Sequence, residues 1–165
     1  MQLAEFNALP APEAEDLVRS CARIRSFVEA VTAARPYTDL GQLRTVARTA
    51  AAAWTAAEVT AALADHPRIG ERLTGAGASA AMSGREQAGV DPADDELHTR
   101  LADGNRRYEE RFGRIYLVRA AGRSGAELLE LLEQRLTNDP ATELAVTREQ
   151  LAEIALLRLE GQITP

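Results

Sequence analysis

The sequence predicts an all-α fold: one compact domain over residues 1–165, built from about seven or eight helices. Two features of the composition support this prediction, because alanine is abundant while aromatic residues make up only 4% of the chain and β-branched runs are few. The third is periodicity, since apolar residues recur at spacings of three and four, as on one face of an amphipathic helix. No internal repeat or low-complexity segment marks a second domain.

Three helices are expected in the first half of the chain, after a short apolar lead-in. Pro36 interrupts the first helical pattern, because proline ends or kinks a helix. Thr55 and Glu58 have the spacing of a capping box, which predicts the start of the third helix. That helix runs up to His66, where Pro67 disfavours helical continuation. The lead-in covers residues 6–10, and the helices cover residues 11–31, 40–54 and 56–64.

The second half contains a short helix, three longer helices and one stretch that is not helical. Ser83 and Ser124 each precede a glutamate by three residues, and this spacing is typical of a helix start. Gly113 and Asn138 mark helix ends. The expected helices begin at Ser83, at Asp91–Pro92, at Ser124 and near Thr142, the last of them running to about Glu160; residues 114–119 form the one short extended segment.

The charge balance narrows the class of partner. A formal net charge of −6 argues against nucleic acid or an anionic membrane, although a small anionic substrate remains compatible if a few arginines face it. No apolar run reaches the length of a membrane span, and the residues MQLAEFNALP lack the pattern of a secretion signal, so the expected compartment is the cytoplasm. Cys21 is the only cysteine, which excludes an intrachain disulfide and a cysteine-built zinc site.

The stretch between His66 and Gln87 is the first candidate for chemistry. His66 is expected at a helix C-terminus, where the helix dipole favours the protonated ring. Ser83 and Glu86 stand at the start of the next expected helix, and glycines and alanines lie between the two helix ends. A lone histidine after a helix is more often a surface or capping residue than a catalyst, so a structural role remains open for both ends.

Arg158 is an anomaly of the last expected helix. Leu151, Ile154 and Ala155 define the inner face of that helix, and position 158 falls on the same apolar stripe. A guanidinium on such a stripe must snorkel outward, pair with a carboxylate or bind an anionic ligand with its planar fork. These three alternatives remain open from the residues alone.

His66, Glu86 and Arg158 form a chemically intelligible set: a group that can move a proton at neutral pH, a carboxylate and a permanent cation. The chain has no Gly-x-Ser-x-Gly elbow, phosphate loop, dinucleotide fingerprint or His-x-x-x-His metal pair. His98 lies in a polar helical segment and is interpreted as solvated surface. The residues therefore predict proton transfer on a small polar substrate, with no cofactor and no metal.

Short motifs in a fixed order run through nearly the whole chain. The most specific are His66-Pro67-x-x-Gly70 and Ser83-x-x-Glu86-Gln87, followed by Phe112-Gly113. The chain resembles, on these motifs, the decarboxylases of 2-oxo-4-hydroxy-4-carboxy-5-ureidoimidazoline (OHCU), which act in urate breakdown. The other matching pieces are Phe6-Asn7-Ala8-Leu9, Arg35-Pro36-Tyr37, Trp54, Asn105-x-x-Tyr108, Arg135-Leu136-x-Asn138, and Glu153-Ile154 through Arg158-Leu159.

The resemblance implies an all-helical homodimer without metal or organic cofactor that releases CO2 from an anionic ureidoimidazoline and yields (S)-allantoin. It implies catalytic roles for His66, Glu86 and Arg158. Arg114 departs from the family, in which an aromatic residue is frequent at that position. The substrate-binding positions that the resemblance implies are Pro67, Ser83, Gly84, Arg85, Glu86, Gln87 and, partly through backbone groups, Ile115, Tyr116, Leu117, Val118 and Arg119.

Two other classes of function remain open at this point. A diverged paralogue would act on a related ureido acid with the same residues. A non-catalytic interaction domain would instead show an exposed apolar stripe and no enclosed polar pocket. The enzyme predicts that His66, Glu86 and Arg158 converge on one cleft.

Overall fold

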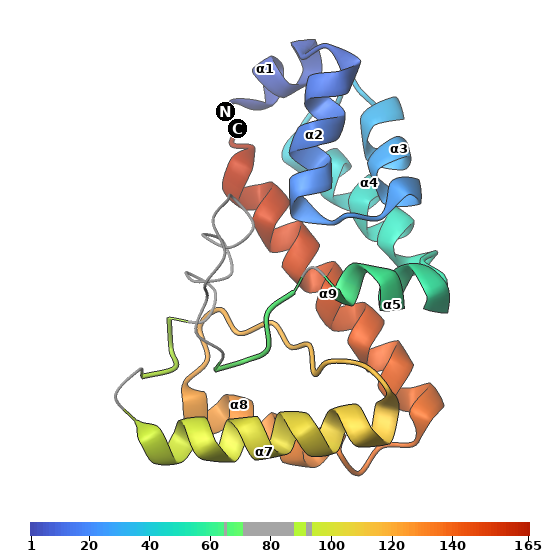
Figure 1. The fold of residues 1–165 in the computed structure, drawn as a ribbon. Coiled ribbons are helices and arrows are strands. Elements are labelled where there is room, and N and C mark those ends of the chain that lie inside the picture. The colour runs from blue at the N-terminus through green and yellow to red at the C-terminus, as the bar shows by residue number, and fades with distance from the viewer. Residues whose placement is uncertain (65, 71–87, 92–93) are drawn as a thin grey trace. The chain divides into compact units, whose positions relative to one another are not determined.

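The structure, a computed structural model, describes residues 1–64, 66–70, 88–91 and 94–165 (Figure 1). Within these residues eight helices account for the regular structure, and the only β pairing is an isolated bridge between Gln2 and Thr164. The all-α prediction is therefore confirmed. The helices are α1 (Leu3–Ala8), α2 (Ala11–Cys21), α3 (Arg25–Ala33), α4 (Leu40–Ala52), α5 (Ala56–Leu63), α7 (Asp95–Phe112), α8 (Gly125–Arg135) and α9 (Pro140–Gln162).

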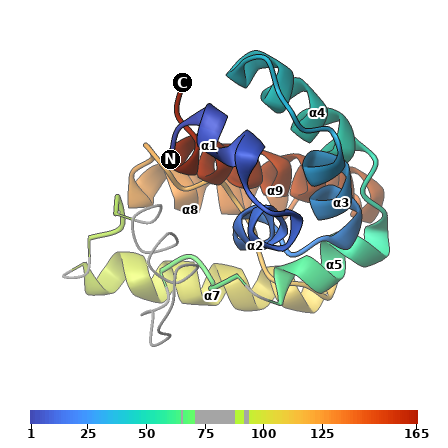
Figure 2. The same cartoon turned by 90° about the horizontal axis from the view of Figure 1, so that it is seen from above.

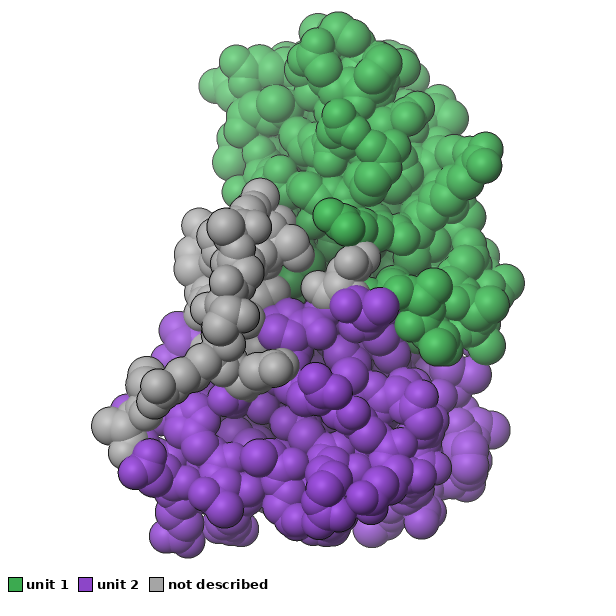
Figure 3. Space-filling view, viewed as in Figure 1, with its two compact units in different colours: residues 1–62, 151–165 green, residues 63–150 purple. Residues whose placement is uncertain are grey.

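The chain divides into two compact units, coloured separately in Figure 3. Unit 1 comprises Met1–Ala62 and Leu151–Pro165, and unit 2 comprises Leu63–Gln150. The expectation of a single domain remains a prediction. No helix in the described part of the chain is long and apolar enough to cross a membrane.

Aromatic contacts organise the core of unit 1. The ring of Phe27 meets that of Trp54 edge-on at 5.4 Å, and Phe6 stacks on Tyr37 at 6.3 Å. Helices α3 and α4 pack side by side, as Figure 2 also shows. Backbone hydrogen bonds tie the two ends of the chain together, since Leu3 N–H donates to the Thr164 carbonyl at 2.8 Å. The first and last residues of the chain thus pair with each other within unit 1.

The single helix expected over residues 11–31 is wrong, because the chain forms α2 and α3 with a break between them. Ala22 and Ile24 adopt extended backbone with φ of −152° and −118°, and both side chains are buried. The break places α3 alongside α2 (Figure 1). Each of the two helices buries one apolar side, with Val18 and Cys21 on α2 and Phe27 and Val28 on α3. No glycine or proline marks the break, so the continuous apolar period concealed it.

Helix α1 was not expected, because residues 6–10 were assigned to an irregular lead-in. The helix has only six residues, Leu3–Ala8, too few to display a helical period. Its start is nevertheless capped, since the Gln2 N–H donates to the Glu5 carboxylate at 2.7 Å.

Helices α7 and α8 form the base of unit 2. They approach closely at Gly104, where an added Cβ would lie 2.5 Å from Leu132 Cδ2. Gly113 ends α7 with a left-handed φ of 67°, as expected, and Ser124 and Glu127 form the expected capping box of α8. Around these helices the apolar core of unit 2 gathers the buried residues Ile69, Val90, Leu101, Tyr108, Tyr116, Val118, Ala120, Leu128, Leu129 and Leu132.

Two helix starts differ by a few residues from expectation. Helix α7 begins at Asp95 rather than at Asp91, because the Asp94 carboxylate accepts the Leu97 N–H at 2.9 Å and caps the helix there. Helix α9 begins at Pro140, since Asp139 accepts the N–H groups of the next turn and proline suits the first helical position.

Candidate functional site

His66 lies just beyond the C-terminus of α5, as the sequence predicted. Its backbone N–H donates to the Leu63 carbonyl at 3.0 Å, which closes the last turn of that helix. The side chain is half-buried. The negative end of the α5 dipole and partial access to solvent together suit a ring that gains and loses protons.

Helix α7 holds the three residues that follow His66-Pro67, one after another. Glu109 binds the Arg68 guanidinium through two contacts of 2.5 and 2.9 Å, and Asn105 Nδ2 donates to the Ile69 carbonyl at 3.0 Å. His98 Nδ1 lies 3.0 Å from the Gly70 carbonyl. Positions 98, 105 and 109 share one face of α7, so contacts from this one face fix the path of residues 68–70. We call these three side chains the α7 clamp.

Glu109 is the charged member of the clamp, and its ion pair with Arg68 stabilises the carboxylate. The hydrogen bond from Arg68 holds the pKa of Glu109 below its ordinary value of 4.5, so the ion pair persists at neutral pH and is lost only in acid. His98 makes a second contact, because its Nε2 lies 3.1 Å from the Asp91 carbonyl. Both ring nitrogens of His98 thus lie within hydrogen-bond distance of backbone carbonyls. The interpretation of His98 as solvated surface is therefore wrong.

A hollow of about 600 Å³ lies along the clamp. Asn105 is 4% exposed, and its buried Oδ1 has no hydrogen-bond partner among the described residues. Neither His66 nor Pro67 lines this hollow among the described residues. The described lining consists of Arg68, Ile69, Gly70, His98, Ala102, Asn105, Arg106, Glu109 and Glu110.

Residues 115–119, the second predicted substrate-binding stretch, form neither helix nor paired strand. Tyr116, Leu117 and Val118 are buried, while Ile115 and Arg119 are half-buried. Burial raises the pKa of the Tyr116 hydroxyl, which donates to the Leu128 carbonyl at 3.3 Å. The sequence predicted an extended segment over residues 114–119, and the structure has neither helix nor paired strand over residues 115–119.

Side chains hold the backbone of this segment at three points. The Leu117 carbonyl accepts from Arg135 Nη1 at 2.5 Å. The Arg119 N–H donates to Gln150 Oε1 at 2.9 Å, and the Arg119 carbonyl accepts from Arg123 Nη1 at 2.8 Å. These contacts take the place that a neighbouring strand would fill in a sheet.

Arg158, the third predicted catalytic residue, belongs to unit 1. It is 6% exposed, so the long-stem snorkelling that the sequence left open is wrong. Its charge acts on the buried Cys21 thiol, where it opposes the larger effect of burial, which raises the thiol pKa to about 11. Gln162 donates to Cys21 Sγ at 3.1 Å on the same side of α9.

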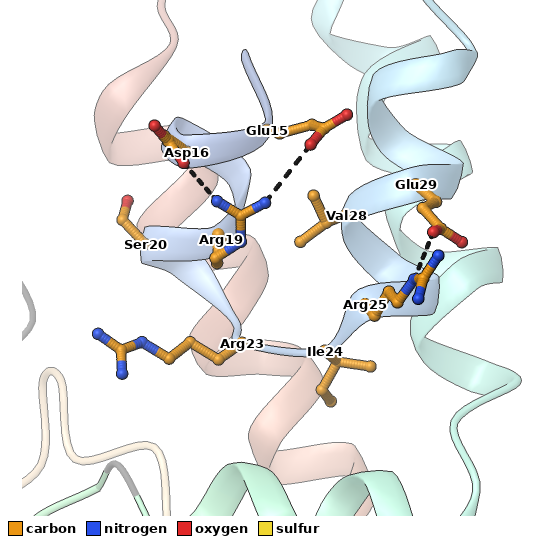
Figure 4. Close-up of a pocket in the computed structure, with 9 residues that line it drawn as sticks. All are labelled: Glu15, Asp16, Arg19, Ser20, Arg23, Ile24, Arg25, Val28 and Glu29. Atoms are coloured by element: carbon orange, nitrogen blue, oxygen red, sulfur yellow. Dashed lines mark hydrogen bonds and ion pairs between the residues drawn. The ribbon is translucent and has the colours of Figure 1, made fainter. Parts of the chain in front are cut away.

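A hollow of about 780 Å³ in unit 1 lies beside the α2–α3 turn (Figure 4). It contains cationic side chains, but two of them are already paired: Arg19 binds Glu15 and Asp16, and Arg25 binds Glu29 at 2.6 Å. Exposed pairs of this kind contribute little free energy and present no buried polar group to a ligand. No residue that the sequence nominated lines this hollow among the described residues.

Five nominated residues, Ser83, Gly84, Arg85, Glu86 and Gln87, lie outside the described residues. His66 and Arg158 belong to different units, so the expected convergence of the catalytic set remains a prediction. Among the described residues no three His, Cys, Asp or Glu side chains gather where they could share a metal ion.

The sequence did not nominate several residues that shape the candidate site. Asn105 stood in a matching motif and on an apolar helical face, where a polar residue needs a partner when buried, but it had no assigned role in the site. Arg135 and Asn138 stood in a matching motif without an assigned role. Glu109 and Gln150 carried no signal, since a charged or polar residue on a helix is ordinarily solvated.

Comparison with known proteins identifies the family of this chain. The model of the OHCU decarboxylase family matches residues 7–160. The chain therefore belongs to the OHCU decarboxylase family.

Two curated relatives align with parts of the chain. The OHCU decarboxylase of Amia calva is 35% identical over 100 residues, which cover 59% of this chain and 57% of the relative. The uric acid degradation bifunctional protein TTL of Arabidopsis thaliana is 37% identical over 59 residues, which cover 36% of this chain and 18% of that protein. The alignments thus span less than two thirds of either relative.

Two solved structures share the fold. A crystal structure of an OHCU decarboxylase in the presence of (S)-allantoin superposes with a TM-score of 0.72 and 23% identity, covering 87% of this chain and 94% of the other. A crystal structure of an (S)-allantoin synthase gives a TM-score of 0.72 and 18% identity, covering 99% of this chain and 54% of the other. At these identities the likeness establishes the fold.

Proposed function

We propose that this protein is a carboxy-lyase that converts OHCU to (S)-allantoin and CO2 in urate breakdown. The observation that carries the proposal is the match of the OHCU decarboxylase family model to residues 7–160, which leaves only short ends of the chain unmatched. The position of His66 at the end of α5 supports it, since the chemistry needs a proton-transfer group that is partly accessible. The reaction requires no cofactor in this proposal.

The mechanism begins with loss of CO2 from a ring carbon next to a carbonyl or imine. The bond to the carboxylate breaks, its electron pair moves onto the ring, and hydrogen-bond donors near the receiving atom stabilise the developing charge. Arg158 and backbone amides of residues 115–119 are the proposed donors. Binding of the substrate carboxylate and carbonyls by a guanidinium also fits its planar fork.

Proton transfer by His66 completes the reaction. The imidazole of His66 takes the proton of the substrate hydroxyl or delivers a proton to one face of the new carbanionic centre. Ser83, Gly84, Arg85, Glu86 and Gln87 would bind the ureido group and the ring nitrogens, and Glu86 would also orient the imidazole. Pro67 would line the site. Because only one face of the substrate meets the proton donor, the product has a single hand.

Other properties of the family extend the proposal. We propose a homodimer that acts in the cytoplasm on its anionic small-molecule substrate, with neither nucleic acid nor a membrane as partner. An interaction domain is the weaker alternative, because among the described residues only Met1 and Leu157 are large hydrophobic side chains exposed to solvent. Sedimentation equilibrium of the purified chain tests the dimer.

The experiment that tests the activity follows the decay of freshly generated OHCU, made from urate with urate oxidase and hydroxyisourate hydrolase. Added protein should raise the first-order decay constant at least ~10-fold over the spontaneous reaction, with kcat in the ordinary enzyme range. Unchanged decay with folded protein would contradict the proposal. Acceleration with a related ureido acid instead would identify a diverged paralogue.

A further inference from the structure

We propose that the buried Arg135–Glu143 ion pair is a positioning device for substrate binding: it sets the backbone of residues 115–119. This inference rests on the proposed function, because it assigns the segment a task in that reaction. It also gives a role to the Arg135-Leu136-x-Asn138 motif, which the proposed chemistry leaves unused.

Four elements of unit 2 meet at the Glu143 carboxylate, which is fully buried. Arg135 Nε and Nη2 donate to its Oε1 at 2.8 and 2.5 Å, and Asn138 Nδ2 donates to its Oε2 at 2.8 Å. The Tyr108 hydroxyl donates to the same carboxylate from α7. With so many donors the carboxylate is fixed in orientation, and so is the guanidinium that it binds.

The free edge of that guanidinium faces the segment. Arg135 uses Nε and Nη2 for Glu143, and its Nη1 donates to the Leu117 carbonyl at 2.5 Å. The same guanidinium lies over the Tyr116 ring, 4.8 Å from its centroid. Because the guanidinium is planar and rigid, fixing one edge on Glu143 fixes the other edge on the segment.

Gln150 and Arg123 hold the segment further along, at the Arg119 N–H and carbonyl. Tyr116, Val118 and Ala120 alternate into the apolar core, which is the side-chain pattern of an extended chain. In such a chain residues 117 and 119 direct their backbone groups to one side. Arg135, Gln150 and Arg123 bind the groups on that side. The inference assigns the opposite side, with the backbone groups of residues 116 and 118, to the ligand.

Stability alone is a poor explanation for the pair. Arg135 is 7% exposed and Glu143 is fully buried, so both charges lose their hydration on folding. Apolar residues of similar volume often replace such a pair without loss of stability. A requirement for one fixed geometry at the Leu117 carbonyl explains the pair better.

The test compares substitutions at both holding points with a matched control. Arg135→Lys keeps the charge beside Glu143, but one ammonium group cannot span Glu143 and the Leu117 carbonyl together. Gln150→Leu removes the acceptor of the Arg119 N–H, and Gln150→Glu restores an acceptor. Arg107→Lys is the control, because Arg107 binds Glu133 through two contacts of 3.0 and 2.8 Å at the surface.

Two readouts are measured on folded protein: kcat/KM for OHCU and amide hydrogen exchange of residues 115–119. Arg135→Lys and Gln150→Leu should each speed exchange in the segment and lower kcat/KM by ~10- to 100-fold, since small misplacements of binding groups have effects of that size. Gln150→Glu should return kcat/KM to within ~3-fold of the parent chain, and Arg107→Lys should leave both readouts unchanged.

The outcomes separate the inference from the proposed function. If the parent chain decarboxylates OHCU and both variants retain its kcat/KM, the positioning role is overturned while the function stands. A lower melting temperature with unchanged kcat/KM overturns it equally, because that is the signature of a merely structural pair. If Arg135→Lys does not fold, the kcat/KM values of Gln150→Leu and Gln150→Glu test the positioning role instead. An inactive parent chain refutes the proposed function, and the inference falls with it.

Discussion

His66 is the residue on which the proposed chemistry depends most. Its ring follows the C-terminus of α5 and is half-buried, so it combines a favourable helix end with access to a proton source. Pro67 immediately after it keeps the chain from continuing as helix, which holds the ring at the helix end.

Replacement of His66 by alanine should abolish turnover without unfolding the protein. We expect kcat to fall by ~10²- to 10⁴-fold, the range that positioned general acids and bases contribute. Circular dichroism should show the parent helix content, because the side chain is only half-buried. A folded His66→Ala protein that retains the parent kcat would show that another group transfers the proton.

Individual residues differ in how far the sequence could predict them. The place of Arg158 on the apolar stripe of its helix could be predicted from the helical period, whereas its burial could not, because a long side chain can also snorkel outward. The partner of Asn105 could not, since the Ile69 carbonyl lies 36 residues away along the chain. The acceptor role of Gln150 could not be predicted for the same reason, because it depends on which backbone amide the fold brings to it.

Helix α7 is the element that organises the candidate site in unit 2. One face carries the α7 clamp on residues 68–70, and the Tyr108 hydroxyl reaches the Glu143 carboxylate. Helix α7 thus holds residues 68–70 directly, and it also contacts Glu143, the partner of the arginine that binds the Leu117 carbonyl. Placing such groups on a helix rather than a loop gives a more precise geometry.

Loss of the central clamp contact should affect activity as well as stability. Asn105→Ala leaves the Ile69 carbonyl without its donor, and we expect the free energy of unfolding to fall by ~1–3 kcal/mol. We also expect kcat/KM to fall ~10-fold, because residues 68–70 directly follow His66-Pro67. Denaturant unfolding and OHCU decay measure the two effects.

Asn7→Ala provides the matched control. Asn7 bridges to the backbone of Tyr37 in unit 1 through two contacts of 2.9 Å, so its loss should lower stability to a similar extent. It should leave kcat/KM unchanged. Equal kcat/KM values for Asn105→Ala and the parent chain would show that the clamp has no part in catalysis.

Helix starts were predicted well where the sequence contains a side-chain capping motif. Thr55 with Glu58, and Ser124 with Glu127, form the capping boxes that their spacing indicated. The break at Ala22–Ile24 had no such signal, because tertiary packing of α2 against α3 sets it. Capped helix starts are thus encoded locally, while this break has no local signal and accompanies the packing of α2 against α3.

At the scale of the whole molecule, motifs in sequence order were more informative than any single residue. The all-α class and the family followed from composition, period and motif order, and the family model matches residues 7–160. The catalytic set is different, because His66 and Arg158 belong to different units and Glu86 lies outside the described residues. Their convergence remains a prediction of the proposed function.

The hand of the product is the most direct test of the central claim that this chain makes (S)-allantoin from OHCU. The measurement is the circular dichroism of allantoin formed from freshly generated OHCU, with and without the protein. We predict accelerated formation of the S enantiomer alone, since one face of the substrate meets the proton donor. Racemic allantoin, formed at the spontaneous rate in the presence of folded protein, would contradict the account.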